Sequence, residues 1–233
     1  MIITKRTHQG HKKNKNEDNF LVREIEPEET LLLVADGLGG HPGGDVASSL
    51  LVQFVAEQTS DTLHRDLNDL LVRAGESIMR YGASHPDVDG MGSTATLAMV
   101  KGKTVRWSHV GDGRLYHFQN DELRCITRDH TLARTLYDQG EITWDEIRGH
   151  KLNHFLEQCL GEDEPEPDSG SFECQAGDIF LLNTDGLHDM VLDSVIQAIL
   201  ADNGDLEKKA DKLLQGALDV GGIDNITFVL CQL

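Results

Sequence analysis

Four aspartates in this chain each lie at the edge of an apolar, strand-like run. Three of them stand beside a glycine and the fourth stands beside an asparagine; they are Asp36, Asp112, Asp185 and Asp224. A carboxylate next to a hydrophobic core is costly unless positive charge meets it. One such aspartate is typical of a turn, whereas four spread along the chain indicate strand ends that converge on one cation site. Hard divalent cations prefer oxygen ligands of this kind.

Further polar residues near these aspartates could join such a site. In the sequence NED, Glu17 and Asp18 could bind a cation directly or through water, and a plain acidic turn is the simpler alternative. Gly37 lets the backbone come close, so that its carbonyl and the Asp36 carboxylate could reach the same ion. The alternative there, with equal weight, is a tight strand-to-helix turn capped by the aspartate. In GDGR, the alternative to a ligand at Asp112 is a salt-bridged hairpin turn.

The net charge of −19 limits the partners that the chain can bind. It argues against nucleic acid or an anionic membrane, because no broad basic face is available. Any phosphate chemistry must therefore rely on metal ions or on a few basic residues. The main basic cluster is Lys12, Lys13 and Lys15, which on composition alone is a solvated loop. Histidine titrates near neutral pH, so His41 could protonate a leaving group, although a lone loop histidine more often only forms hydrogen bonds.

Length and composition predict a single domain over residues 1–233. The chain is 39% hydrophobic, which is enough for a sizeable core, and it contains no internal repeat and no linker. No apolar run approaches the roughly 20 residues of a membrane span. The polar N-terminus lacks the apolar stretch of a secretory signal. The four cysteines are far apart and form no CxxC pair, which predicts reduced thiols in a cytoplasmic protein.

The hydrophobic pattern predicts the elements that must position the aspartates. The apolar run at 31–35 ends directly before Asp36 and is typical of a strand buried on both faces. Residues 93–127 read as four strands whose separators, KGK, GDG and QND, are short enough to predict antiparallel neighbours throughout. The other expected elements are strands at 2–7, 19–25, 178–184 and 225–233, helices from residue 45 and at 63–78, 191–200 and 206–218, and an irregular helical insert at 131–162. Strand meanders with helix pairs predict an α+β fold layered as a sandwich.

Seven sequence blocks, taken in order, resemble a known family. The blocks are NED, VADGLGGHPGGDVAS, GSTA, HVGDGR, TRDHTLA, DIFLLNTDGL and DNIT. Their order resembles the metal-dependent protein serine/threonine phosphatases of type 2C in their compact bacterial form, from about Thr7 to Val229. The resemblance implies a four-layer α-β-β-α sandwich, with two antiparallel sheets flanked by helix pairs. It also implies hydrolysis of phosphoserine and phosphothreonine in proteins by attack of a metal-bridging water or hydroxide.

The resemblance further implies how the core ions are held. Asp36 would bridge two Mn²⁺ or Mg²⁺ ions, and the carbonyl of Gly37 would bind one of them. Asp185 and Asp224 would complete the ligands of the other ion. Such a pair of ions would share a water molecule and lower its pKa towards neutrality, which makes it a nucleophile for phosphorus.

The same resemblance implies accessory roles for the remaining candidates. Asp18 and Glu17 would contact the core ions directly or through water. Asp112, together with Asp185, corresponds to the position of a third, weaker ion in bacterial members. His41 corresponds to a proton donor, and Lys13 stands where the family has the arginine that binds the substrate phosphate.

The chain departs from the family pattern at several places. Lysine offers a point charge instead of the two-pronged guanidinium of arginine, so Lys13 predicts weaker substrate binding. Gly113 replaces the serine that usually follows the Asp112 aspartate, which predicts a looser turn. Residues 138–170, where the family carries a variable flap, match only weakly, and substrate choice is expected to reside there.

Two other classes of protein compete with the phosphatase hypothesis. A catalytically inactive relative that binds phosphoproteins or scaffolds a kinase would be expected to lose core aspartates, yet Asp36, Asp185 and Asp224 are all present. A Ca²⁺-binding structural domain is disfavoured because the aspartates do not lie in one loop with EF-hand spacing. We therefore expect a monomeric enzyme whose partners are phosphoproteins, the targets of a serine/threonine kinase.

Overall fold

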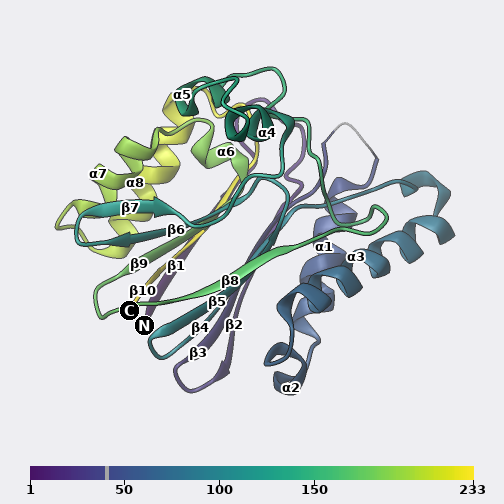
Figure 1. The fold of residues 1–233 in the computed structure, drawn as a ribbon, viewed down its shortest axis with the longest axis horizontal. Coiled ribbons are helices and arrows are strands. Elements are labelled where there is room, and N and C mark those ends of the chain that lie inside the picture. The colour runs from purple at the N-terminus through teal and green to yellow at the C-terminus, as the bar shows by residue number, and fades with distance from the viewer. Residues whose placement is uncertain (40–41) are drawn as a thin grey trace.

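Two five-stranded antiparallel sheets pack face to face in the computed structural model, which describes residues 1–39 and 42–233 (Figure 1). Sheet A contains, in spatial order, β1 (Ile2–His8), β10 (Ile226–Gln232), β9 (Ile179–Asn183), β6 (Arg114–Gln119) and β7 (Glu122–Cys125). Sheet B contains β2 (Asp18–Glu26), β3 (Glu29–Asp36), β4 (Ala95–Lys101), β5 (Thr104–Val110) and β8 (Asp168–Glu173). This arrangement confirms the predicted α+β sandwich.

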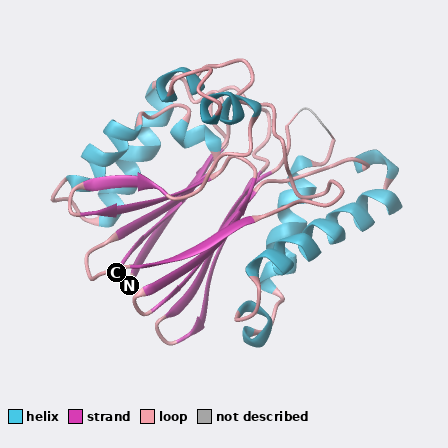
Figure 2. Cartoon of the chain, viewed as in Figure 1, coloured by secondary structure: helices cyan, strands magenta, loops and turns pink. Residues whose placement is uncertain are grey.

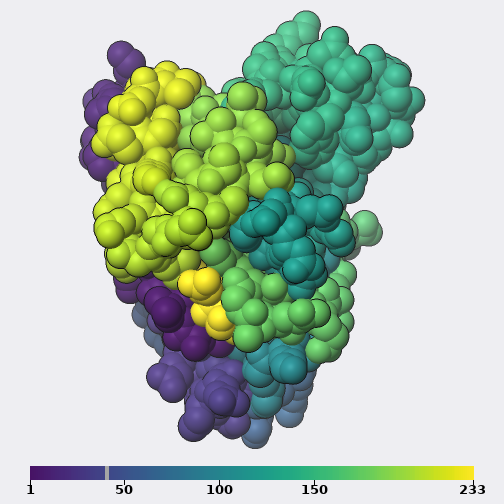
Figure 3. Space-filling view, turned by 90° about the vertical axis from the view of Figure 1, so that its left-hand side faces the viewer, coloured from purple at the N-terminus to yellow at the C-terminus, as the bar shows by residue number. Residues whose placement is uncertain are grey.

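Helices cover the outer faces of both sheets (Figure 2). Sheet B is covered by α1 (Gly44–Ala56) and α3 (Leu67–Ser84), with α2 (Ser60–Leu63) and the 3₁₀ turn η1 (Pro86–Val88) at the ends of α3. Sheet A is covered by α7 (Asp193–Ala201) and α8 (Leu206–Asp219), preceded by α6 (Asp185–His188) (Figure 3). The 131–162 segment carries α4 (Leu132–Asp138) and α5 (Trp144–Ile147). Among the described residues, no helix combines the length and the apolarity needed to cross a membrane.

Strand periodicity explains why the sandwich has three hydrophobic layers. Successive side chains of a strand point to opposite faces. In β3, Leu31 and Leu33 pack into the layer under α1 and α3, whereas Leu32 and Val34 pack between the two sheets. Both sets are fully or almost fully buried. The predicted strand with two buried faces is therefore confirmed.

A capping residue sets the start of α3. The side chain of Asp66 accepts a hydrogen bond from Asn68 N at 2.8 Å, so that the helix begins at Leu67. This bond satisfies one of the free N–H groups of the first turn. The helix predicted for 63–78 is therefore divided, because Leu63 ends the short α2 before the cap.

The prediction of a four-stranded meander over 93–127 is wrong at one connection. The separators KGK and QND do join antiparallel neighbours, β4 with β5 and β6 with β7. The GDG separator instead crosses from β5 in sheet B to β6 in sheet A, and these two strands do not pair with each other. A short connection can pass between two packed sheets as well as between adjacent strands. The crossing places Asp112 at the edge where the two sheets meet.

Strand β8 was not predicted, because its first residues belong to the segment 138–170, which was expected to be a variable flap. It pairs with β5, from His109 with Asp168 to Thr104 with Glu173, at the edge of sheet B. Most of its side chains are exposed, and its centre contains glycine and serine, which have weak strand propensity. An exposed edge strand carries little of the hydrophobic alternation from which strands are recognised.

Candidate metal centre

Both sheets end at the same edge of the sandwich, and this edge carries the aspartates. Asp18 begins β2 and Asp36 ends β3, where the two residues are direct register partners in sheet B. From sheet A, Thr184 follows β9, and its hydroxyl donates to Asp18 Oδ2 at 2.8 Å. Asp185 is the next residue and begins α6. A hydrogen bond between the two sheets therefore ties the first pair of aspartates to Asp185.

The four strand-edge aspartates, Asp36, Asp112, Asp185 and Asp224, all line one cavity of about 210 Å³. The structure thus brings together the residues that the sequence predicted to converge. The cavity is shared by both sheets, since these aspartates follow or precede strands of each. The other lining residues are Lys13, Leu38, Gly39, Thr94, His154 and Leu156.

Burial and repulsion by neighbouring aspartates raise the pKa values of four buried carboxyls at this edge, those of Asp18, Asp36, Asp112 and Asp185. For Asp36 and Asp185, burial is the largest cause, followed by the charges of neighbouring aspartates, and both pKa values lie well above their usual range. Burial also raises the pKa of Asp18 to about 7 and that of Asp112 to about 8. Ionising such a cluster without a counter-charge costs folding free energy. This cluster of buried aspartates is therefore suited to bind a cation.

Two carboxylate oxygens in the cluster are buried and have no hydrogen-bond partner among the described residues, Asp18 Oδ1 and Asp185 Oδ1. Most buried polar atoms in proteins are paired. Two unpaired carboxylate oxygens in one cluster therefore indicate a ligand that completes them. Oxygen donors of this type suit Mg²⁺, Mn²⁺ or Ca²⁺ better than the softer metals that cysteine selects. The residues present fit a hard divalent cation.

Gly37 provides a close backbone approach beside Asp36. A Cβ atom at position 37 would lie 2.0 Å from the carbonyl oxygen of Gly44, so no other residue fits there. Its N–H donates to the carbonyl of Glu17 at 3.2 Å. The backbone at Gly37 is thereby fixed next to both the Asp36 carboxylate and the loop that contains Glu17.

The loop from residue 9 to residue 17 brings Lys13 and Glu17 to the rim of the cavity. Lys13 Nζ lies 2.7 Å from Asp224 Oδ1. A Cβ atom at Gly39 would lie 3.3 Å from Lys13 Nζ and 3.6 Å from Glu17 Oε2, which places both side chains over the same glycine. Burial, the largest cause, raises the pKa of Glu17. The proton donor predicted at His41 lies outside the described residues.

Three residues near the cavity were missed in the sequence. Asp189 and His154 lie beside Asp185: His154 Nδ1 is 4.0 Å from Asp185 Oδ2 and 3.9 Å from Asp189 Oδ2. Ligand atoms of His154, Asp185 and Asp189 all lie within 4.8 Å of one another, close enough to hold one ion.

Asn225, the third missed residue, holds the Asp224 loop in place. Its amide nitrogen donates to the carbonyls of residues 9 and 15, and its amide oxygen accepts from the N–H of residue 17.

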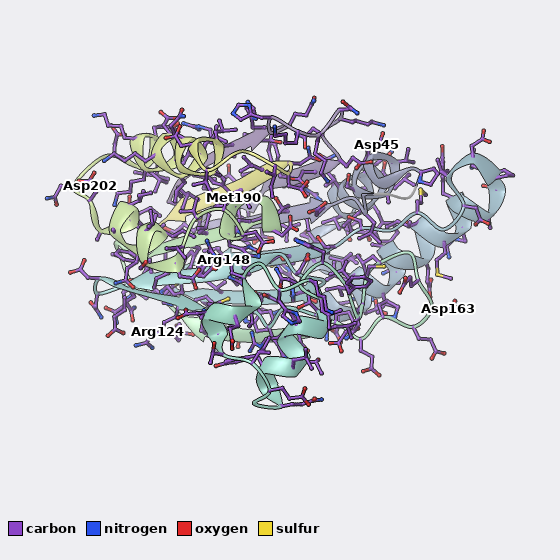
Figure 4. All side chains as sticks on the ribbon, turned by 90° about the horizontal axis from the view of Figure 1, so that it is seen from above. Asp45, Arg124, Arg148, Asp163, Met190 and Asp202 are labelled. Carbon is purple, nitrogen blue, oxygen red and sulfur yellow. The ribbon has the colours of Figure 1, made fainter. Side chains whose placement is uncertain are left out.

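The 131–162 segment is anchored to α6 and thus to the cavity. Arg148 donates to the carbonyls of His188 and Val191, the latter at 2.9 Å, and lies beside Met190 when the molecule is seen from above (Figure 4). Asn153 Nδ2 donates to Asp189 Oδ1 at 3.2 Å. These contacts explain how a weakly patterned segment places a histidine at the cavity.

We expect the metal-free protein to lose stability as the pH rises from about 5 to about 8. Asp18 and Asp112 have an ordinary pKa of 3.8, and the folded state raises these values to about 7 and about 8. Between the two limits the folded state binds more protons than the unfolded chain, so the free energy of unfolding falls with rising pH. The loss should be on the order of several kcal/mol, measured by thermal melts in a chelating buffer. A melting temperature that rises or stays constant over this range would contradict the raised pKa values of Asp18 and Asp112.

Comparisons with known proteins identify the class of enzyme. The model of the family described as protein phosphatase 2C matches residues 6–215. The serine/threonine phosphatase Stp of Listeria innocua is 34% identical over 236 residues, which cover 97% of this chain and 94% of the relative. The crystal structure of serine/threonine phosphatase Stp1 from Staphylococcus aureus has a TM-score of 0.92 at 30% identity and covers 99% of this chain and 94% of that one. The catalytic domain of PstP in complex with 2 manganese ions has a TM-score of 0.85 at 33% identity, over 99% and 97% of the two chains.

These matches place the chain among the serine/threonine protein phosphatases. Within that class, it belongs to the protein phosphatase 2C family. The family inferred from the ordered sequence blocks is therefore confirmed.

Proposed function

We propose that this phosphatase hydrolyses phosphoserine and phosphothreonine in proteins with Mn²⁺ or Mg²⁺ bound at the carboxylate cluster. The observation that carries the proposal is the cavity lined by four strand-edge aspartates, with two buried carboxylate oxygens unpaired among the described residues. The PstP catalytic domain, which has a similar fold, is in complex with 2 manganese ions, and this supports the binding of divalent cations.

The proposed ligands of the two core ions are Asp36, the Gly37 carbonyl, Asp185 and Asp224. Asp36 would help to hold the ions at the centre of the site, because its carboxylate lies near those of Asp18, Asp112, Asp185 and Asp224, which together raise its pKa. Accessory roles fall to three residues near this core: Asp18 and Glu17, directly or through water, and Asp112, which with Asp185 would hold a third ion. Asp189 and His154 could add further donors beside Asp185.

Each part of the cavity has a chemical task in this proposal. Bound cations would supply the positive charge that polarises the phosphoryl group and brings the pKa of the attacking water towards neutrality. The carboxylates fix where that charge lies, since they come from strands of both sheets. Lys13 adds a single positive charge at the rim, beside Asp224, where the oxygens of the substrate phosphate would enter.

The cysteines are poor candidates for a covalent route. Burial raises the pKa of Cys125 to about 11 and that of Cys159 to about 12, so their thiolates are scarcely populated at neutral pH. Burial likewise raises the pKa of Cys174 to about 11 and of Cys231 to about 12. Direct attack of water on phosphorus is therefore the favoured route.

The same proposal extends to organisation and context. Residues 1–233 would act as one catalytic domain, because both sheets contribute carboxylates to the cavity and share a hydrophobic layer. Four unpaired cysteines suit a reducing compartment such as the cytoplasm. The substrates would be phosphoproteins produced by a serine/threonine kinase.

Hydrolysis of a phosphothreonine peptide and of an aryl phosphate tests the proposal. Turnover is expected with Mn²⁺, should cease when a chelator is added, and should return with excess Mn²⁺. Turnover that is insensitive to the chelator would contradict the proposal. Binding of the phosphopeptide without any turnover would favour an inactive, phosphoprotein-binding relative instead.

A Lys13→Ala variant is expected to raise KM for the phosphothreonine peptide roughly tenfold, with a smaller change in kcat, since one charge-assisted contact is worth about 1.5–3 kcal/mol. Lys13→Arg should lower KM below that of the unmodified protein, because a guanidinium can bind phosphate through two hydrogen bonds. Steady-state kinetics measure both effects. Lys12→Ala removes an exposed neighbouring lysine and serves as the matched control. An unchanged or higher KM in Lys13→Arg would exclude this role for the lysine.

A further inference from the structure

The sequence blocks GDGR and TRDH meet at the Asp112 turn, and of their residues only Asp112 has a part in the proposed chemistry. This turn, Gly111–Gly113, crosses from β5 in sheet B to β6 in sheet A. Asp112 is buried and lines the cavity with the other aspartates. The position of its carboxylate therefore depends on the groups that hold the turn.

Two buried histidines hold Gly111, the residue before Asp112. Gly111 N donates to Nδ1 of His130 at 3.2 Å, and the Gly111 carbonyl accepts from the backbone N–H of His130 at 2.7 Å. The same carbonyl lies 2.9 Å from Nε2 of His109. Since a carbonyl oxygen can only accept, Nε2 of His109 carries a proton, and Nδ1 of this neutral ring is an acceptor. The hydroxyl of Thr96 lies 2.9 Å from Nδ1 and donates to it.

Gly113, on the other side of Asp112, leaves the space that this hydroxyl occupies. A Cβ atom at position 113 would lie 2.7 Å from Thr96 Oγ1 and 3.2 Å from the carbonyl oxygen of Asn183. Any side chain at position 113 would therefore push the hydroxyl away from His109. The sequence predicted that glycine loosens this turn. In the structure, glycine instead makes room for the group that orients the histidine.

We propose that Thr96 is a positioning residue that acts on Asp112 through His109 and Gly111. Glycine is required at position 113 because a side chain there would displace the Thr96 hydroxyl. The inference rests on the proposed function, in which Asp112 is a cation ligand. Thr96 is not among the residues that line the cavity. Its hydroxyl fixes the tautomer of His109, and the histidine fixes the carbonyl of the residue before the ligand.

Titration calorimetry with Mn²⁺ tests the positioning role. Thr96→Val keeps the shape of the side chain and removes the hydroxyl, whereas Thr96→Ser keeps the hydroxyl. Thr96→Val is expected to weaken the lowest-affinity Mn²⁺ site about tenfold, and Thr96→Ser should stay within about twofold of the unmodified protein. Adding Thr96→Val to Asp112→Asn should cause no further loss, because the ligand is already absent. Three results would overturn the role. They are an unchanged Mn²⁺ affinity in Thr96→Val, an equal loss of Mn²⁺ affinity in Thr96→Val and Thr96→Ser, and a further loss when Thr96→Val is added to Asp112→Asn.

The link between positions 96 and 113 has a test that needs no metal. In a chelating buffer, Gly113→Ala should lower the melting temperature by about 5 °C when Thr96 is present. In a Thr96→Ala background the same change should cost less than about 2 °C, because the clashing oxygen is gone. Equal costs in both backgrounds would overturn the link. A failure of the proposed function would show differently, as no Mn²⁺ binding and no turnover in the unmodified protein.

Discussion

An Asp185→Asn variant is expected to lose activity on a phosphothreonine peptide by roughly 10³-fold and, at the same time, to gain stability in the absence of metal. Asparagine keeps the size of the side chain and removes the charge that would hold a cation. The gain in stability follows because Asp185 Oδ1 is buried without a partner among the described residues, and because neighbouring aspartates repel this carboxylate. The two effects have opposite signs, so a misfolded variant cannot produce both.

Steady-state kinetics with saturating Mn²⁺ and urea unfolding in a chelating buffer measure these effects. Asp163→Asn makes the same change in charge at an exposed position of the segment between α5 and β8 and serves as the control (Figure 4). It should leave both activity and stability close to those of the unmodified protein. Full activity in Asp185→Asn, or a lower stability without metal, would contradict the assignment of this residue as a cation ligand.

The second large effect is expected at the buried ion pair between Asp129 and Arg114, the residue that directly follows the Asp112 turn. Asp129→Ala should lower the free energy of unfolding by roughly 3–5 kcal/mol, because the buried Arg114 guanidinium then keeps only the more distant carboxylate of Asp193, 3.8 Å away and 34% exposed. Arg114 Nε and Nη2 donate to the two oxygens of Asp129 at 2.6–3.2 Å, and the two side chains are 6% and 2% exposed. Burial alone would raise the pKa of Asp129, yet the Arg114 charge holds it below its usual value.

An exposed pair in the next strand provides the matched control. Arg124 and Glu122 lie 2.8 Å apart, but their side chains are 71% and 66% exposed. Glu122→Ala should therefore cost less than about 1 kcal/mol. Urea unfolding at constant pH compares the two variants. Similar costs at the two pairs would show that burial does not determine the strength of the Arg114 contact.

Much of the site could be predicted because local sequence carries the relevant physics. The run at 31–35 is apolar on both faces, so a central strand ending at Asp36 follows from hydrophobic burial alone. An acidic residue placed there needs a counter-charge, which is why the convergence of four such residues could be inferred. A close backbone approach at Gly37, beside Asp36, was also predicted, and in the structure only glycine fits there against the Gly44 carbonyl.

What could not be predicted depends on contacts between distant segments. The GDG connection has the length of a hairpin, and only the packing of two sheets shows that it crosses between them. His154 lies in a segment without periodicity, and its place beside Asp185 depends on the anchoring of Arg148 to α6. Asp189 could in principle be placed beside Asp185, because it follows that residue by one helical turn. However, α6 spans only Asp185–His188, which is too short to be recognised as a helix from the sequence.

Gly113 shows how a substitution can be misread without the fold. Compared with the family serine, glycine suggested a flexible turn. The structure shows that Thr96 Oγ1 occupies the volume of the missing side chain, so the two positions must be read as a pair. A departure from a family pattern is therefore understood only when the residue packed against it is known.

The central claim is that the strand-edge aspartates hold divalent cations. A crystal of the protein soaked in Mn²⁺ and measured at the manganese absorption edge tests it most directly. We expect two strong anomalous peaks among Asp36, Asp185 and Asp224, with any weaker third peak beside Asp112. Anomalous peaks confined to other surfaces, with the cavity containing only water, would contradict it.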